Sequence, residues 1–228
     1  MSFNNGWEPL LSRQDLQQAD VFIGIGASVL SETEVPFTRT VAQALGKKYI
    51  EFSDNGISNE TIFRYISYAN LKYSNAIIMP VFTYLVREEL VDTADIVHIA
   101  MPRMLDGKNG RIKQAEMFYG YIWNEQQSVA RFWNRMYDSK QASKQSNNIM
   151  ISVWDSASGY DDNIALELNK PNLGQLLTDE FKAACIDRNA FREFYLETLE
   201  RSAELNFHMT QESHRKLANI LLKGSNND

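Results

Sequence analysis

The first 82 residues alternate short apolar runs with segments of helical periodicity, and this alternation constrains the fold more than any other feature. The apolar runs cover residues 20–27, 47–52 and 75–82, and each is too short for a typical helix. Between them, residues 35–46 and 58–73 space their apolar side chains along one face of a helix. Strands that alternate with helices predict a parallel sheet covered on both faces. We therefore expect an α/β fold with three layers, α/β/α, around a central parallel sheet.

Beyond residue 82 the expected elements are less regular. Residues 95–102 and 149–155 are apolar runs that predict two further strands. A stripe of aromatic and aliphatic side chains predicts a long helix over 113–138, and core packing is the simplest role for that stripe. The polar residues 139–148 favour a connection between this helix and the next strand.

The last third of the chain predicts a loop followed by helices. Residues 156–175 are rich in turn-forming residues and favour a surface loop or an insertion. A second long helix is expected over 178–205, and a final one from Gln211 to Lys223 with Thr210 as its cap. No repeat or linker divides the sequence, so we expect a single domain over residues 1–228.

Composition narrows the class of protein. The formal net charge of −6 argues against a nucleic-acid partner, because binding to phosphates needs a basic surface. No run of about 18 apolar residues predicts a membrane span, and the first residues lack the pattern of a secretory signal. A single cysteine, Cys185, excludes an internal disulfide framework. These features favour a cytoplasmic protein.

The glycine-rich turn in the segment VFIGIGASVLSE, residues 21–32, is compatible with two kinds of site. It begins as G-x-G, as dinucleotide-binding turns do, and Glu51 near the end of the next strand is a candidate ribose ligand. However, Val29 stands where a small residue is needed, and the next helix is expected only at about Pro36, away from a bound phosphate. The alternative is a turn that displays Ser28 as a nucleophile. We expect no cofactor.

Two of the three histidines lie near the end of the sequence. His208 precedes the final helix and is a candidate base, because a serine after the first strand and a residue near the last helix can share one edge of the sheet. His214, in the first turn of that helix, is more typical of a structural residue. The two are six residues apart without an evident third ligand, so we expect no metal site. His98 is expected in a strand or loop without a chemical role.

Four segments in order resemble the SGNH/GDSL hydrolase superfamily, over about residues 20–222 except for 100–180. The first is IGIGASVLSE, in which Ser28 would be the nucleophile. The second is YIEFSDNGISNETIFR, in which the Gly56 N–H would bind the oxyanion, and it also resembles a divergent phage and bacterial branch. The third position is held by AIIMPVFTYLVRE, and the fourth segment, NFHMTQESH, would supply His208 as the base.

The resemblance implies a flavodoxin-like SGNH hydrolase fold and a serine hydrolase that cleaves an ester, such as a carbohydrate O-acetyl group or another small acyl ester. A neighbouring base would activate the Ser28 hydroxyl. The N–H groups of Ser28 and Gly56 would stabilise the oxyanion. The third block lacks its usual asparagine, which leaves Thr83 or Tyr84 as the further donor.

Two other positions depart from the superfamily pattern. Ala27 stands where an aspartate commonly precedes the serine, and Asn206 stands where an aspartate usually orients the base. Asn206 can orient the imidazole of His208 without neutralising its charge. Asp155 or Glu204 are alternative partners, and a Ser–His dyad is a further alternative.

Three residues near the expected strand ends, Asn59, Arg64 and Arg87, are candidates for substrate binding. The two arginines can hold an anionic group of the substrate, or they can be solvated or paired with carboxylates. A second functional hypothesis also stays open. It is a catalytically impaired domain that binds or assembles, associated with a virion or forming a homo-oligomer.

Overall fold

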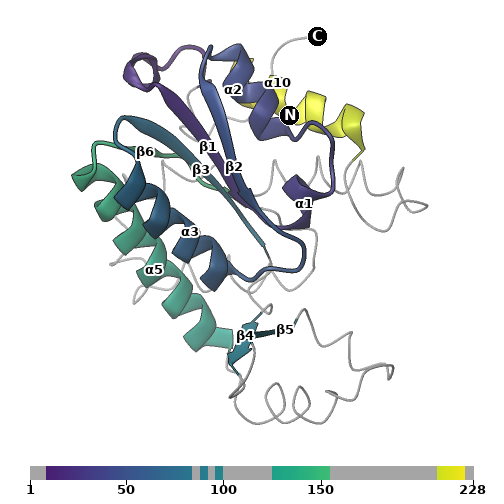
Figure 1. Cartoon of the computed structure of the whole chain (residues 1–228), viewed down its shortest axis with the longest axis vertical. Helices are drawn as coiled ribbons and strands as arrows, with labels where there is room; N and C mark the ends of the chain where they lie inside the picture. The colour runs from purple at the N-terminus through teal and green to yellow at the C-terminus, as the bar shows by residue number, and fades with distance from the viewer. Residues whose placement is uncertain (1–8, 84–87, 92–95, 100–124, 155–209, 224–228) are drawn as a thin grey trace.

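The structure is a computed structural model that describes residues 9–83, 88–91, 96–99, 125–154 and 210–223. Within these residues the centre is a parallel sheet with the strand order β2-β1-β3-β6, and β7 also pairs with β3 (Figure 1). Its strands are β1 (Val21–Gly26), β2 (Lys48–Ser53), β3 (Ala76–Phe82), β6 (Ile149–Met150) and β7 (Val153–Trp154). A separate antiparallel hairpin is made by β4 (Glu88–Val91) and β5 (Ile96–Ile99).

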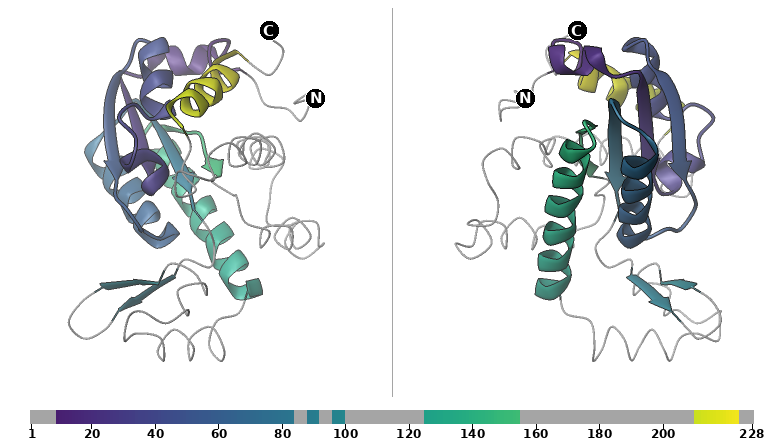
Figure 2. Two further views of the ribbon diagram at one scale, coloured as in Figure 1. Left: turned by 90° about the vertical axis from the view of Figure 1, so that its right-hand side faces the viewer. Right: turned by 60° about the vertical axis from the view of Figure 1, so that its left-hand side comes forward.

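Helices cover both faces of the parallel sheet. The helical elements are η1 (Gln14–Gln18), α1 (Ser28–Ser31), α2 (Phe37–Ala44), α3 (Asn59–Lys72), α5 (Glu125–Gln145) and α10 (Gln211–Lys223). Helices α2 and α10 pack together on one face, and α3 and α5 lie side by side on the other (Figure 2). The arrangement confirms the predicted three-layer α/β/α fold with a central parallel sheet.

Strand β1 lies at the centre and is buried on both faces. Phe22 packs into the core under α2 and α10, while Ile23 and Ile25 pack into the core under α3 and α5. Burial on both faces explains why the sequence here is a continuous apolar run rather than an alternating one. Because all strands of this sheet are parallel, their carboxyl ends meet at one edge, and Gly26 lies in register with Ser53 and Val81 there.

The two glycines of β1 have packing roles. A Cβ on Gly24 would come within 2.6 Å of the Tyr49 hydroxyl oxygen, and a Cβ on Gly26 would come within 2.9 Å of Leu30 Cδ1. Gly26 therefore allows α1 to start directly after β1 and fold back against the strand. We expected the next helix only at about Pro36, and for the longer helix α2 this is confirmed. The one-turn helix α1 in front of it was missed.

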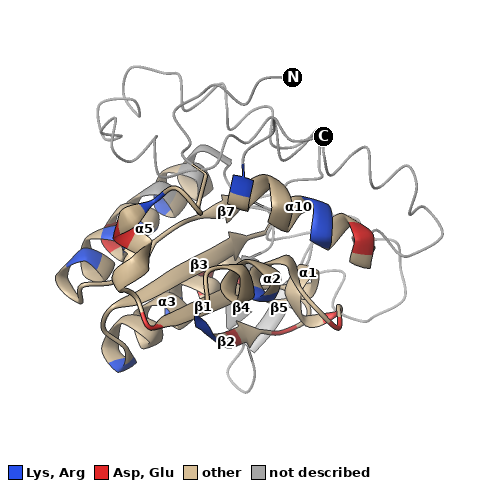
Figure 3. Ribbon diagram, turned by 90° about the horizontal axis from the view of Figure 1, so that it is seen from above, with Lys and Arg blue, Asp and Glu red and all other residues tan. Residues whose placement is uncertain are grey.

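The final helix was predicted with its boundaries. Helix α10 runs from Gln211 to Lys223, and the hydroxyl of Thr210 accepts a hydrogen bond from the Ser213 N–H at 3.2 Å. Its charged residues, which Figure 3 marks by colour along the helix, are all exposed. Lys216 pairs with Glu212 one turn away. At the other end of α10, residues 10–11 donate their N–H groups to the carbonyls of residues 221–222.

Beyond residue 82 the structure corrects two expectations. The strand expected over 95–102 is present as β5, but β5 pairs with β4 in the hairpin and not with the parallel sheet, where β6 lies beside β3. Residues 139–145 are not a connection but the last turns of α5. Ser143 is buried there and its hydroxyl accepts a hydrogen bond from the Asn70 amide of α3 at 3.0 Å, so tertiary contact extends the helix despite its polar sequence.

Several expected elements lie outside the described residues. These are the loop over 156–175, the helix over 178–205 and the first part of the helix over 113–138. The single domain over residues 1–228 therefore stays a prediction. Of the helices that are described, none is both long enough and apolar enough to cross a bilayer.

Candidate functional site

Ser28 and Thr83 follow two neighbouring strands at the carboxyl edge of the sheet. Gly26 of β1 and Val81 of β3 are partners in register, and Ser28 and Thr83 each lie two residues beyond them. Ser28 is the first residue of α1 and is partly exposed. Its hydroxyl makes no hydrogen bond to any residue that the structure describes. Thr83 is only 1% exposed.

The turn that carries Gly56 lies against the turn that carries Ser28. The Asp54 N–H reaches the Gly26 carbonyl at 3.4 Å, and the Ser31 hydroxyl at the end of α1 donates to the side-chain oxygen of Asn55. Gly56 has a φ of +73°, a conformation that favours glycine, and nothing lies within 4 Å of the position its Cβ would take. The structure thus brings the backbone of Ser28 and the Gly56 turn to the same edge.

Asn59, the first residue of α3, is bound to the main chain of Thr83. Its amide nitrogen donates to the Thr83 carbonyl at 2.9 Å, and its amide oxygen accepts the Thr83 N–H at 2.9 Å. Asn59 is 7% exposed, and both polar atoms of its side chain have partners in the protein. We expected this residue to bind substrate, and the structure shows it holding the end of β3.

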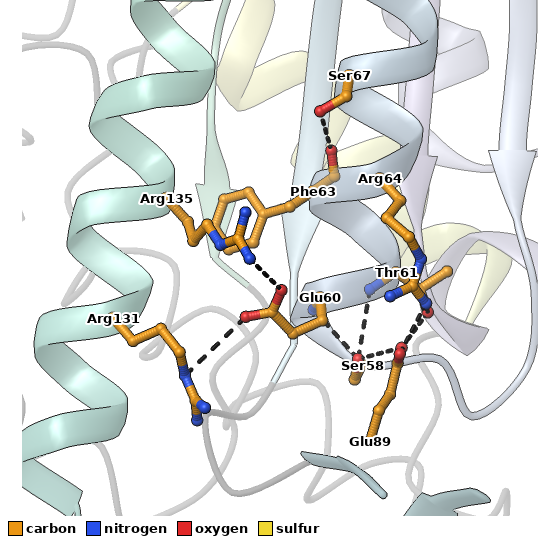
Figure 4. A network of polar contacts seen from close by, with 9 residues as sticks. All are labelled: Ser58, Glu60, Thr61, Phe63, Arg64, Ser67, Glu89, Arg131 and Arg135. Carbon is orange, nitrogen blue, oxygen red and sulfur yellow. Dashed lines mark hydrogen bonds and ion pairs between the residues drawn. The ribbon is translucent and has the colours of Figure 1, made fainter. Parts of the chain in front are cut away.

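Arg64 is held by a carboxylate from the hairpin. Its guanidinium lies 2.7 Å from Glu89 and 2.8 Å from the Thr61 hydroxyl (Figure 4). Glu89 also accepts hydrogen bonds from Thr61 and from Ser58, the residue that caps α3, the latter at 2.6 Å. Of the two alternatives for Arg64, the structure favours pairing with a carboxylate over binding of an anionic substrate group.

Glu89 is charged despite its burial. Its side chain is 6% exposed. Burial alone raises the pKa of this carboxyl group, but the hydrogen bonds from Ser58, Thr61 and Arg64 outweigh it and the pKa lies below its ordinary value. Glu89 could not be identified as this partner from the sequence, because it is 25 residues from Arg64.

A second ion pair joins the two helices of this face. Glu60 of α3 lies 3.6 Å from Arg135 and 4.0 Å from Arg131, both on α5 (Figure 4). The contacts of Glu60 link the first turn of α3, which also carries Asn59, to α5.

His214 is part of the core and is not available as a base. It is 1% exposed, its Nδ1 accepts the Phe37 N–H at 3.2 Å, and its ring stacks on that of Phe37 with centroids 5.9 Å apart. Burial lowers the pKa of His214 to about 4, so the ring is neutral at ordinary pH. This agrees with the structural role that we expected. His98 lies on β5, opposite Glu89 in the hairpin.

The start of α10 is fixed beside the loop that follows the Ser28 turn. The side-chain oxygen of Gln211 accepts the Thr33 hydroxyl at 3.1 Å and the Val35 N–H at 3.3 Å, and its nitrogen donates to the Val35 carbonyl at 2.6 Å. Gln211 has no distinguishing sequence signal, since a glutamine in the first turn of an amphipathic helix is usually solvated.

Several predicted site residues lie outside the described part of the chain, namely Asn206, His208, Arg87, Tyr84, Asp155 and Glu204. Within the described ranges, no three histidine, cysteine, aspartate or glutamate side chains gather closely enough to hold a metal ion. Glu51, the candidate ribose ligand, accepts hydrogen bonds from the hydroxyls of Tyr49 at 2.9 Å and Ser53 at 2.5 Å. Its carboxylate is therefore engaged within the protein.

Comparison of the whole chain with known proteins gives a match at the level of fold. No family model and no curated protein matches the sequence. Among solved structures, a protein from Parabacteroides merdae assigned as a GDSL-like lipase is similar with a TM-score of 0.51 and 11% identity, over 91% of this chain and 96% of that one. The protein YxiM of Bacillus subtilis is similar with a TM-score of 0.50 and 12% identity, and the match covers 91% of this chain but 56% of YxiM. The chain therefore has the α/β fold of a GDSL-like hydrolase, as the four sequence segments had indicated.

Proposed function

We propose that this protein is a serine hydrolase that cleaves an ester, with Ser28 as the nucleophile. The observation that carries the proposal is the meeting of Ser28, the Gly56 turn and Thr83 at the carboxyl edge of a parallel sheet. In open α/β sheets, this edge is where ligands bind. The likeness to a GDSL-like lipase supports the same reaction class by analogy of fold.

The proposed reaction has two steps. In the first, the Ser28 oxygen attacks the acyl carbonyl while a base takes its proton, and the alcohol leaves with that proton as the acyl-enzyme forms. In the second, water attacks the acyl-enzyme and releases the acid. The oxyanion of each step accepts hydrogen bonds from the N–H groups of Ser28 and Gly56 and from the Thr83 hydroxyl. Removing a single donor of this kind typically costs about 10²–10³ in rate.

We propose His208 as the base. It lies two residues before Thr210, the residue that caps α10. The bonds of Gln211 fix this end of α10 beside residues 33–35, shortly after Ser28. His214 is held in the core by Phe37, so we propose His208 rather than His214 as the base.

Asn206 is the proposed orienting residue for His208, with Asp155 and Glu204 as alternatives. An amide in place of a carboxylate lowers turnover in a serine protease by about 10⁴. With Asn206 alone we therefore expect a slow enzyme. A carbohydrate O-acetyl group or another small acyl ester is the proposed substrate, with Arg87 as the candidate contact for an anionic group.

Covalent labelling tests the proposal directly. The wild-type protein, Ser28→Ala and Ser67→Ala are treated with a fluorophosphonate probe and assayed with p-nitrophenyl acetate. Ser67 lies within α3, where its hydroxyl bonds the Phe63 carbonyl, so it serves as a matched serine control. We expect labelling and turnover in the wild type and Ser67→Ala only. Equal labelling of wild type and Ser28→Ala, or none of either, contradicts the assignment.

The departures at Ala27 and Asn206 favour one other function, a domain of this fold that binds or assembles without catalysis, as in a virion component. This alternative predicts turnover of p-nitrophenyl acetate and of longer esters no faster than that of Ser28→Ala.

A further inference from the structure

The residue after β3, Thr83, has a buried hydroxyl that none of the described residues hydrogen-bonds. Thr83 is 1% exposed, and its N–H and carbonyl are both bonded to the Asn59 side chain at 2.9 Å. Its hydroxyl makes no hydrogen bond to any part of the chain that the structure describes. A buried hydroxyl that is left unpaired costs free energy, so its retention calls for a partner that arrives from elsewhere.

We propose that Asn59 is a positioning residue, which holds Thr83 so that the threonine hydroxyl is presented to the oxyanion at the Ser28 site. The inference rests on the proposed hydrolase function and assigns a new role to Asn59. The third sequence block lacks the asparagine that commonly supplies a side-chain donor. Here an asparagine from the start of α3 reaches the same strand end and bonds its backbone, and the threonine supplies the donor.

The geometry of the two hydrogen bonds explains why they fix the hydroxyl. They hold the peptide groups on both sides of the Thr83 Cα, so the strand end cannot rotate and the direction of the Cα–Cβ bond is set. Threonine is branched at Cβ, which restricts its χ1 angle. The hydroxyl is thus oriented before substrate arrives, which is the condition under which a donor stabilises an oxyanion well.

Asn59 is itself held firmly. It follows Ser58, whose hydroxyl caps α3 by accepting the N–H groups of Glu60 and Thr61 and also donates to Glu89. Among side chains of this length, only asparagine offers both a donor and an acceptor, since aspartate lacks the donor and leucine lacks both.

A double-mutant cycle tests the inference. Asn59→Leu, Thr83→Val and the double variant are compared with wild type for kcat and KM on p-nitrophenyl acetate and for the rate of fluorophosphonate labelling. We expect each single variant to lose about 100-fold in kcat with little change in KM. Because Asn59 acts through the Thr83 hydroxyl, the kcat of the double variant should lie within about 3-fold of that of the less active single variant. Thr83→Ser keeps the hydroxyl and should stay within about 10-fold of wild type.

Thermal unfolding of each variant separates positioning from stability. If the loss of kcat in the double variant equals the product of the two single losses, the inference is overturned. An Asn59→Leu protein with a lower Tm, but with an unchanged kcat well below that temperature, overturns it too. If Asn59→Leu does not fold, Asn59→Asp takes its place, since it keeps the acceptor for the Thr83 N–H and lacks the donor. If the wild type is active and the two losses of kcat multiply in the double variant, only the role of Asn59 is overturned. A wild type without labelling or turnover overturns the hydrolase function and this role together.

Discussion

The Nδ1 atom of His214 accepts the backbone N–H of Phe37 at 3.2 Å, and the two rings stack with an interplanar angle of 15°. This pair joins the last helix to the start of α2 in the core. His214→Ala removes the ring and leaves a buried N–H unpaired, so we expect a loss of about 2–4 kcal/mol in the free energy of unfolding. Urea unfolding measures it. The exposed neighbour Arg215, changed to alanine, should alter stability by less than about 0.5 kcal/mol. Equal effects of the two substitutions would contradict a structural role for His214.

The same histidine should make stability depend on pH. The folded pKa of His214 is about 4, below its ordinary value of 6.5, so the unfolded chain binds a proton there more readily than the folded protein. The contribution of His214 to the free energy of unfolding is therefore complete above about pH 6.5 and is lost as the pH falls toward 4. The difference corresponds to roughly 3 kcal/mol. Unfolding measured at several pH values should show this slope in wild type and a shallower one in His214→Gln. Parallel curves would show that other groups are responsible.

Glu89 should stabilise the first turn of α3 and the hairpin that follows β3. Glu89→Ala leaves the hydroxyls of Ser58 and Thr61 without their common acceptor, so we expect a loss of about 1–3 kcal/mol. Arg64→Ala should cost less than about 1 kcal/mol, because the guanidinium is 54% exposed. Because the pKa of Glu89 is lowered on folding, its contribution is present above the ordinary pKa of about 4.5 and falls in more acidic solution. Thermal unfolding of both variants at two pH values tests whether Glu89→Ala loses more stability than Arg64→Ala. A larger loss in Arg64→Ala would contradict it.

Gly26 should be required for the position of the Ser28 turn. In Gly26→Ala the new methyl group lies 2.9 Å from Leu30 Cδ1 and 3.3 Å from Val81 Cβ, so α1 must shift. We expect a loss of about 1–3 kcal/mol and slower fluorophosphonate labelling of Ser28. Leu30→Ala added to this variant removes the nearest contact and should restore part of the labelling rate. Labelling at the wild-type rate in Gly26→Ala would show that α1 tolerates the shift.

The three strands and two longer helices of the first 82 residues, and the final helix, were predictable because their periodicity is clear, whereas the short η1 and α1 were not. Strand β1 is apolar throughout, and α10 has a threonine cap and an apolar stripe. The partner of β5 was misassigned because a strand of four residues, three of them apolar, does not reveal whether its neighbour is parallel or antiparallel. The last turns of α5 were missed because the buried bond between Ser143 and Asn70 overrides a polar sequence.

The candidate site was predictable only in part. Parallel topology alone places Ser28 and Gly56 at one edge, since both follow strands of the same sheet. The bonds of Asn59 to Thr83 and of Arg64 to Glu89 join residues 24 and 25 positions apart. Such contacts of polar side chains leave no periodic signal in the sequence, so Asn59 was expected to bind substrate and the carboxylate partner of Arg64 could not be identified.

The attachment of Gln211 to Thr33 joins positions 178 residues apart. A nascent chain on the ribosome therefore makes its first strand and the Ser28 turn long before it makes the helix that covers them. Until that helix emerges, the apolar side chains that pack against α10 stay exposed to water and to chaperones. Contacts between residues far apart in the sequence are also the slow part of folding. The site should thus become able to react only after residues 211–223 have been made, in a single late step rather than in proportion to chain length.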